Sequence, residues 1–207
     1  AIFITSDKVY KNMEWNWGYK ENDIIGGVDP YSASKSCCEH AIRSYFESYL
    51  IKSNTNKIAI ARAGNVVGGG DWSEDRIVPD IIKYWQKKST LSIKNKNATR
   101  PWQHVLEPLS GYLLLGQKLY EGKIKSGEAY NFGPNNLGHI PVIDLVKRIN
   151  KFINFKFKIT KSKNIIKETS LLKLNSEKAY RDLEWHTILE LQDIIEFTSN
   201  WYLMFYN

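Results

Sequence analysis

The feature that most constrains the fold is the alternation of short apolar runs with longer amphipathic segments along the chain. Apolar runs that end in polar or glycine-rich residues predict strands at 1–6, 57–62, 91–93, 129–132 and 155–159. Apolar residues at spacings of three and four predict helices at 30–49, 77–88, 105–120, 141–152 and 190–205. Strands that alternate with helices predict an α/β fold with a mostly parallel sheet.

The helix predicted at 30–49 has a well-marked start. Asp29 is a typical N-cap residue, and Pro30 is favoured in the first helical turn. Apolar side chains then recur at helical spacing and predict a buried face made of Cys38, Ala41, Ile42, Tyr45, Phe46 and Tyr49. We expect the adjacent cysteines, Cys37 and Cys38, to be buried or half-buried and not to form a mutual disulfide.

Composition excludes several classes of protein. With 43% hydrophobic residues, the chain can bury a sizeable core, and no apolar stretch approaches the ~18 residues of a membrane span. Two cysteines exclude disulfide frameworks and cysteine metal clusters, and they fit a reducing cytoplasm. The net charge of +7 fits either a lysine-rich surface or a site for an anionic, nucleotide-linked substrate. No nucleic-acid-binding motif is present, so we expect no nucleic-acid partner.

A candidate catalytic pair lies at the start of the first helix. Tyr31 and Lys35 are four residues apart, which places both side chains on one helix face about one turn apart. Tyrosine is a weak base at neutral pH, but a nearby ammonium group and the positive end of a helix both stabilise its phenolate form. The spacing alone also occurs by chance in helices that have no catalytic role.

The context of this pair makes the pattern more specific. Ser6, Asp7 and Lys8 follow the first predicted strand, and strand ends in open α/β sheets face the ligand-binding crevice. A hydroxyl, a carboxyl and an amine at that point form a set able to transfer protons. The alternative is an ordinary polar turn. The combination of TSDKVY, PYSASK and RAGNVVGGGDW in this order is much rarer than any one of the three.

These motifs resemble the extended short-chain dehydrogenase/reductases, in particular the nucleotide-sugar 4,6-dehydratases. TSDKVY, RAGNVVGGGDW, RIVPDII and RPWQHVLEPLSGYL are most similar to the CDP-glucose branch of that group. The resemblance is specific from Ile2 to about Asn135 and looser beyond. The dTDP-glucose branch usually has Thr-Asp-Glu where this chain has Ser6, Asp7 and Lys8, and a lysine in the third position is the pattern of the CDP-glucose branch.

The resemblance implies a redox-neutral dehydration with tightly held NAD. Tyr31 would take the proton of the sugar 4-hydroxyl while hydride leaves C4 for the nicotinamide. Lys8 would then remove the C5 proton as a base, and Asp7 would help the 6-hydroxyl leave as water before hydride returns to C6. Ser6 would hydrogen-bond the 4-oxygen, and Lys35, together with Tyr31, would contact the cofactor.

The remaining motifs are interpreted as parts of a nucleotide-sugar site. Asn65 suits either a hydrogen bond to a diphosphate or a turn before the glycines. Arg76 and Arg100 suit bidentate binding of phosphate, or they are ordinary surface arginines. Trp102 and His104 either line the same pocket, serve core packing or mark the entry to the following helix. Two further features stay open between ligand binding and local structure. Gly68-Gly69-Gly70 is an anion site or a turn, and the pair Trp15 and Trp17 is a lid or a hydrophobic anchor.

The predicted fold is a partial Rossmann-like, doubly wound sheet with a small C-terminal α/β substrate-binding lobe. Residues 1–66 would form the C-terminal part of the NAD-binding domain. Residues 67–207 would form mainly the sugar-nucleotide lobe, with about 105–133 returning to the Rossmann core. The family's Gly-x-x-Gly-x-x-Gly fingerprint is not present. Since the chain opens at Ala1 in an apolar run, we expect a fragment that lacks roughly a hundred residues and most of the cofactor site.

Two alternatives to a dehydratase remain. One is another nucleotide-sugar enzyme of the same group, an epimerase or a decarboxylase, that uses Tyr31 and Lys35 without elimination. Asp7 and Lys8 argue against an epimerase, which needs no acid and base at C5 and C6. The other is an inactive remnant that binds a nucleotide sugar or dimerises. The resemblance also implies a homodimer formed through the helices that contain Tyr31 and follow Val105, although core packing explains their apolar faces equally well.

Overall fold

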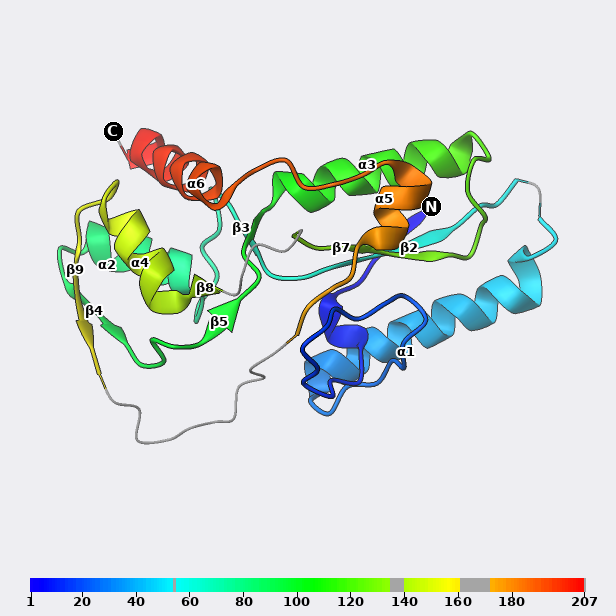
Figure 1. Ribbon diagram of the computed structural model, residues 1–207, viewed down its shortest axis with the longest axis horizontal. Helices are drawn as coiled ribbons and strands as arrows, with labels where there is room; N and C mark the ends of the chain where they lie inside the picture. Colours follow the sequence, from blue (N-terminus) through cyan, green and yellow to red (C-terminus); the bar gives the residue numbers. More distant parts are fainter. Residues whose placement is uncertain (54, 135–139, 161–171, 207) are drawn as a thin grey trace. The chain divides into compact units, whose positions relative to one another are not determined.

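The computed structural model describes residues 1–53, 55–134, 140–160 and 172–206 (Figure 1). The chain folds into two compact units. Unit 1 consists of Ala1–Gly64, Leu106–Asn135 and Leu171–Ile188, and unit 2 consists of Asn65–Val105, Asn136–Ser170 and Leu189–Asn207. Strands alternate with helices in both, so the predicted α/β class is confirmed.

Unit 1 is built on a three-stranded parallel sheet in the order β1-β2-β7. Its strands are β1 (Ile2–Ile4), β2 (Ala59–Ala63) and β7 (Ala129–Phe132). Its helices are a 3-10 turn η1 (Asp7–Val9), α1 (Pro30–Tyr45), a π-helical turn η2 (Phe46–Leu50), α3 (Leu106–Tyr120) and α5 (Glu177–Leu183). Every residue of β2 is buried, because this strand has a neighbour on each side.

Helices cover both faces of this sheet (Figure 1). Successive side chains of a strand point to opposite faces. Ala59, Ala61 and Ala63 of β2 therefore share a hydrophobic cluster with side chains of α3 and α5, whereas Ile60 clusters with Ile42 of α1. Small alanines let α3 approach the sheet closely. A parallel sheet with helices on both faces is the doubly wound arrangement that the sequence predicts.

The start of α1 is as predicted, but its buried face is not. Asp29 is the N-cap and its side chain accepts a hydrogen bond from the Ser32 N–H, and Pro30 stands in the first turn. The buried residues of α1 are Ser32, Ser36, Glu39 and Ile42. Of the six apolar residues expected to be buried, only Ile42 is buried and Phe46 is half-buried. The predicted stripe is wrong because this helix contacts the sheet through polar groups.

Other burial predictions also need correction. Cys37 and Cys38 are both exposed free thiols, because they lie on the outer side of α1. The predicted absence of a disulfide between them is confirmed. The apolar run at 1–6 predicts a strand with buried side chains, yet Phe3 and Ile4 are exposed, because β1 is an edge strand of this sheet.

In its described residues, unit 2 contains three helices and three short strand pairs. The helices are α2 (Ile77–Gln86), α4 (Val142–Asn150) and α6 (Leu191–Tyr206). The parallel pairs are β3 (Val66–Val67) with β6 (Gln103–His104), and β4 (Thr90–Ile93) with β9 (Lys156–Ile159). The antiparallel pair is β5 (Thr99–Arg100) with β8 (Ile140–Pro141). One hydrophobic cluster, which includes Ile81, Leu145 and Ile195, joins the three helices.

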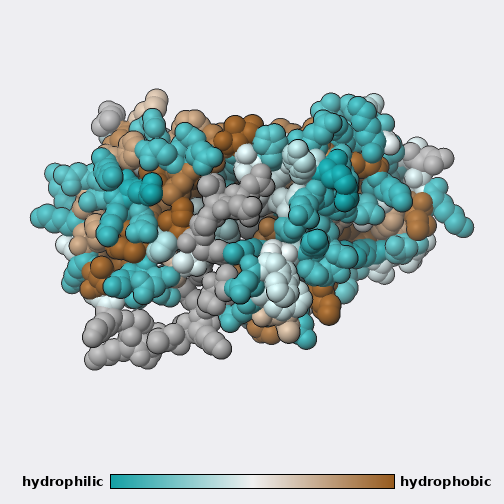
Figure 2. All heavy atoms as spheres, viewed as in Figure 1, coloured by the Kyte–Doolittle hydropathy of each residue, from teal (hydrophilic) through white to brown (hydrophobic). Residues whose placement is uncertain are grey.

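Apolar side chains also appear on the surface. Figure 2 shows apolar patches among hydrophilic side chains on the viewed face. Exposed apolar residues include Tyr45 on α1 and Leu113 on α3, the two helices assigned to the predicted dimer interface. Within the described ranges, no helix combines the length and apolarity that a membrane crossing requires.

Candidate active site

The polar turn after β1 is compact and mostly buried. Ser6 and Asp7 are buried and Lys8 is half-buried. The Ser6 hydroxyl donates to Asp7 Oδ1 at 2.9 Å and accepts from the Lys8 N–H at 3.1 Å. The Gly64 Cα lies beside the Asp7 carboxylate, since a Cβ there would stand 3.4 Å from Asp7 Oδ2. The turn thus holds a hydroxyl and a carboxyl in fixed contact at the carboxyl end of the strand.

Tyr31 and Lys35 lie at the exposed start of α1. Tyr31 is 55% exposed, so its phenol is open to a ligand, and the Lys35 ammonium lies 5.6 Å from the centre of the Tyr31 ring. Asp29 caps the same helix end. Hydrogen bonds from the Ser32 hydroxyl and N–H lower the pKa of Asp29, and the positive charge of Lys8 acts in the same direction.

The structure brings these two groups of residues together. The helix α1 packs against η1, and the Ser36 hydroxyl donates to the Val9 carbonyl at 2.9 Å. Ser36 is the residue after Lys35, and Val9 is the residue after Lys8. A phenol, two ammonium groups, a carboxyl and a hydroxyl are therefore gathered where α1 meets the end of β1. Such a set can move protons on and off a bound ligand.

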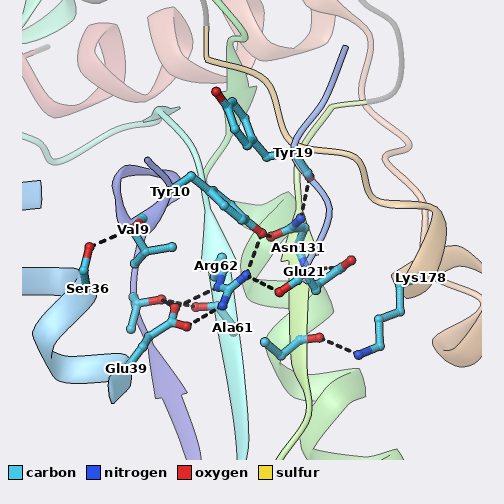
Figure 3. Close-up of polar contacts among 12 residues, drawn as sticks. Val9, Tyr10, Tyr19, Glu21, Ser36, Glu39, Ala61, Arg62, Asn131 and Lys178 are labelled. Carbon is cyan, nitrogen blue, oxygen red and sulfur yellow. Dashed lines mark hydrogen bonds and ion pairs between the residues drawn. The ribbon is translucent and has the colours of Figure 1, made fainter. Parts of the chain in front are cut away.

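A buried ion pair joins α1 to β2 (Figure 3). Glu39 on α1 and Arg62 on β2 have fully buried side chains. Arg62 Nε donates to Glu39 Oε1 at 2.8 Å, and Arg62 Nη2 donates to Glu39 Oε2. The Thr5 hydroxyl donates to the same Glu39 Oε1 at 2.7 Å. Burial opposes the charge of Arg62, but hydrogen bonds and electrostatic attraction from Glu39 and Tyr10 together outweigh this and raise the pKa of Arg62.

The other side of the Arg62 guanidinium reaches the loop after η1 (Figure 3). Its Nη1 donates to the Tyr10 hydroxyl at 2.6 Å and to the Glu21 carbonyl at 3.1 Å. The Tyr10 hydroxyl in turn donates to Asn131 Oδ1 at 2.7 Å, and burial raises the pKa of Tyr10, which keeps this proton in place. The Asn131 side chain donates to the Tyr19 carbonyl at 2.8 Å. This polar network ties the loop to β2 and β7.

Sequence reasoning did not identify Arg62, Glu39 or Asn131. A signal was present for Arg62, which ends the apolar run KIAIAR in a predicted strand. A charged group in such a strand requires a buried partner of opposite charge. Nothing in one sequence tells which of the chain's acidic residues supplies it.

Three candidate residues for phosphate lie in unit 2. Asn65 is half-buried and follows β2 by two residues. Arg76 is exposed at the start of α2 and pairs with Asp71 at 3.5 Å. Arg100 ends β5, and its side chain lies outside the described residues.

Trp102 and His104 are both buried in unit 2. Trp102 belongs to the hydrophobic cluster of this unit, and its indole N–H donates to the Ile140 carbonyl at 3.3 Å. His104 lies on β6 with its ring edge-on to Phe197, 5.9 Å between centroids. These are packing contacts within unit 2, and a role of either residue in a ligand pocket stays a prediction.

The glycine run and the tryptophan loop also have local structural partners. A Cβ at Gly69 would overlap the Trp201 ring, so this residue is a glycine because an aromatic ring packs on its backbone. Trp15 stacks on Tyr19 with centroids 5.3 Å apart, and Trp17 lies 5.2 Å from Trp15. Trp15 thus packs into the loop, whereas Trp17 is exposed. Across the described ranges, no group of three or more His, Cys, Asp or Glu side chains is placed to bind a metal ion.

Comparison with known proteins adds a family and a fold. A family model described as GDP-mannose 4,6 dehydratase matches residues 1–198. The chain is 40% identical, over 207 residues, to CDP-glucose 4,6-dehydratase of Salmonella typhimurium, and the match covers 98% of this chain and 58% of that protein. The chain therefore spans less than two thirds of the length of this relative.

Solved structures show the same fold at low sequence identity. The structure of dTDP-glucose 4,6-dehydratase from Bacillus anthracis in complex with NAD superposes with a TM-score of 0.78 at 19% identity, covering 98% of this chain and 61% of that one. UDP-glucose 4-epimerase from Thermotoga maritima with UDP-glucose gives a TM-score of 0.82 at 17% identity, covering 100% and 64%. At this level of identity the likeness shows the Rossmann-like fold alone.

Proposed function

The chain belongs to the GDP-mannose 4,6 dehydratase family of nucleotide-sugar enzymes, and from this premise we propose that it carries the acid–base residues of a CDP-glucose 4,6-dehydratase. The family predicted from the motifs is confirmed. The observation that carries the finer proposal is the packing of α1 on η1, which gathers Tyr31, Lys35 and Lys8 with Ser6 and Asp7. The 40% identity to a CDP-glucose 4,6-dehydratase supports this substrate.

The first proton transfer is carried out by residues at the start of α1. Tyr31, as phenolate, takes the proton from the sugar 4-hydroxyl, and the Lys35 ammonium stabilises that phenolate by its charge. Ser6 hydrogen-bonds the 4-oxygen. The resulting 4-ketone acidifies the proton on C5, because the carbanion left at C5 is stabilised as an enolate.

The elimination is carried out by the residues of the turn after β1. Neutral Lys8 removes the proton from C5, the C5–C6 double bond forms, and the C6–O bond breaks. The protonated Asp7 carboxyl gives its proton to the departing 6-hydroxyl, which leaves as water. The Ser6 hydroxyl orients this carboxyl through its contact with Asp7 Oδ1. Elimination leaves a 4-keto sugar with a C5–C6 double bond. Return of a hydride to C6, which NAD would supply, and of a proton to C5 from Lys8 would complete a 4-keto-6-deoxy sugar.

The donor set at the start of α1 fits a nicotinamide dinucleotide. An exposed phenol and a neighbouring ammonium can both hydrogen-bond the hydroxyls of a ribose, so Tyr31 and Lys35 would hold that part of NAD. NAD supplies the acceptor for hydride from C4 and the donor of hydride to C6. The glycine fingerprint that binds the pyrophosphate is not among the 207 residues.

For the nucleotide-sugar diphosphate we propose Asn65 and the two arginines, Arg76 and Arg100. An exposed guanidinium such as that of Arg76 can exchange its weak pair with Asp71 for a phosphate, which offers it two oxygens. Trp102 and His104 would support this site from the core of unit 2.

The test uses the protein at its native length, CDP-glucose, and deuterated water. The expected products are a 4-keto-6-deoxy sugar, seen by its absorbance, and deuterium at C5. Tyr31→Phe should lower kcat by about 10²- to 10⁴-fold, the usual contribution of acid–base catalysis. Lys8→Met should abolish deuterium at C5, whereas Asp7→Asn should keep C5 exchange and lose the release of water. A parent protein that forms no 4-keto product from CDP-glucose would rule out the proposal.

A further inference from the structure

The side of α1 that faces the sheet is unusual because it is polar. A helix on a sheet normally presents apolar side chains, whose contacts have no preferred direction. Here Glu39 is fully buried two turns after Tyr31 and one turn after Lys35, and Ser36 lies between. The helix that carries the proposed catalytic pair is therefore attached to the sheet by directional hydrogen bonds.

The carboxylate of Glu39 contacts two different parts of the sheet at once. Arg62 of β2 binds both of its oxygens, and Thr5, at the end of β1, donates to one of them. Thr5 immediately precedes Ser6, Asp7 and Lys8. One buried side chain thus joins the helix of Tyr31 and Lys35, the central strand, and the start of the turn that carries the proposed elimination residues.

The contact between Glu39 and Arg62 allows only a small range of positions for α1. A fork-to-fork contact between a guanidinium and a carboxylate tolerates little displacement, because both hydrogen bonds must stay aligned. Moving α1 by one residue shifts it by about 1.5 Å and rotates the side chains by about 100°, which takes Glu39 out of reach of Arg62. The apolar contact of Ile42 with Ile60 would tolerate smaller slides along the strand.

Stability does not explain why the pair is there. Two buried charges lose their hydration, so an apolar pair of similar size is often equally stable or more stable. A buried pair of this kind is expected where a unique placement matters. The placement that matters here is that of α1 over the end of β1, where a misplacement of about 1 Å can reduce turnover about a hundredfold.

We propose that Glu39, Arg62 and Thr5 are positioning residues, which set the place of Tyr31 and Lys35 relative to Ser6, Asp7 and Lys8. This inference rests on the proposed function for its readout in turnover. The residues do not touch the substrate; they fix the helix that carries the groups that do. Arg62 also positions the loop after η1, because it donates a hydrogen bond to the Tyr10 hydroxyl.

The test replaces the polar contact without leaving a buried charge. The double variant Glu39→Leu with Arg62→Met keeps side-chain volume and should fold, and Thr5→Val removes a single hydroxyl. We expect the double variant to lower kcat about a hundredfold, with KM for CDP-glucose changed less than about threefold. Arg62→Lys keeps the charge without the planar fork, and it should also lose turnover.

A matched control is another ion pair of unit 1 whose partners are far apart in the sequence. Lys178 on α5 pairs with Glu128 next to β7, away from α1, and Lys178 also binds the Ala129 carbonyl. The double variant Lys178→Met with Glu128→Gln should change the melting temperature and leave kcat unchanged. Equal loss of kcat in this control and in the Glu39 and Arg62 double variant would overturn the inference, because it would show a general effect of stability.

Crystal structures of the parent and of the Thr5→Val and double variants separate this inference from the proposed function. We expect Tyr31 to be displaced relative to Asp7 in the variants, whether or not the parent turns over CDP-glucose. An unmoved Tyr31, or a folded double variant with parental kcat, would overturn the inference. If the double variant does not fold, Thr5→Val decides in the same way: an unmoved Tyr31 and parental kcat would contradict it.

Discussion

At the scale of single residues, Glu21 beside the buried polar network makes stability depend on pH. Glu21 accepts a hydrogen bond from the Asn131 N–H at 2.8 Å, and burial raises the pKa of Glu21 above its ordinary value of 4.5. Between these two pKa values the folded chain binds more protons than the unfolded chain. The free energy of unfolding therefore falls as pH rises through this range.

Glu21→Gln should remove this loss, because glutamine keeps the acceptor for Asn131 and does not titrate. We expect the variant to lose less stability than the parent when pH is raised from about 4.5 to 7, measured by urea unfolding at each pH. Glu47→Gln, an exposed site on η2, serves as the control and should follow the parent. If the free energy of unfolding depends on pH in the same way for the parent and Glu21→Gln, Glu21 does not cause the loss of stability between about pH 4.5 and 7.

The site residues also show how far sequence reasoning reaches at this scale. Ser6, Asp7, Lys8, Tyr31 and Lys35 were identified because they form short motifs at fixed spacing. Arg62 and Glu39 are 23 positions apart in the chain. Their contact depends on which face of α1 meets β2, and one sequence does not specify that. Their roles, like those of the motif residues, remain predictions.

At the scale of elements, helices were located well and their faces less well. The ends of α2, α3, α4 and α6 fall within two residues of the predicted ends, because long periodic segments carry a strong signal. The seven residues of α5 were missed, as were the two-residue strands β3, β5, β6 and β8, because so few residues show no periodicity. The face of α1 was misassigned because serines and a glutamate replace the usual apolar contacts.

Two glycines of α3 give opposite predictions within one helix. A Cβ at Gly111 would overlap the Phe132 ring, whereas a Cβ at Gly116 would meet only Ile2 Cγ1 at 3.8 Å. Gly116→Ala should stabilise the protein by about 0.4–1 kcal/mol, because alanine restricts the unfolded chain and favours the helix. Gly111→Ala should destabilise it by about 1–3 kcal/mol through overpacking.

Chemical denaturation of both variants measures the difference, and each serves as the control for the other because both replace a helical glycine by alanine. Destabilisation of similar size at both sites would contradict the close packing of α3 on β7. Stabilisation at both would show that Phe132 moves aside at little cost.

At the scale of the whole molecule, the α/β class followed from the alternation of elements, and the doubly wound sheet of unit 1 agrees with it. Which segments of the chain form unit 2 was harder to predict. Its core draws on three separate stretches of chain, including α2, α4 and α6. Contacts between distant stretches arise from tertiary packing, and the local periodicity of the sequence does not predict them.

Each unit has hydrophobic clusters of its own, and this predicts that damage to one core stays largely within its unit. Ile81 of unit 2 and Leu115 of unit 1 are both fully buried. Replacing either with alanine should cost about 2–5 kcal/mol, since the side chain's transfer energy and the cavity both count. In Ile81→Ala, hydrogen exchange should accelerate mainly at the amides of α2, α4 and α6. In Leu115→Ala, it should accelerate mainly at β2, β7 and α3. Equal acceleration in both units after either substitution would instead identify a single cooperative unit, because opening would then require both cores to separate together.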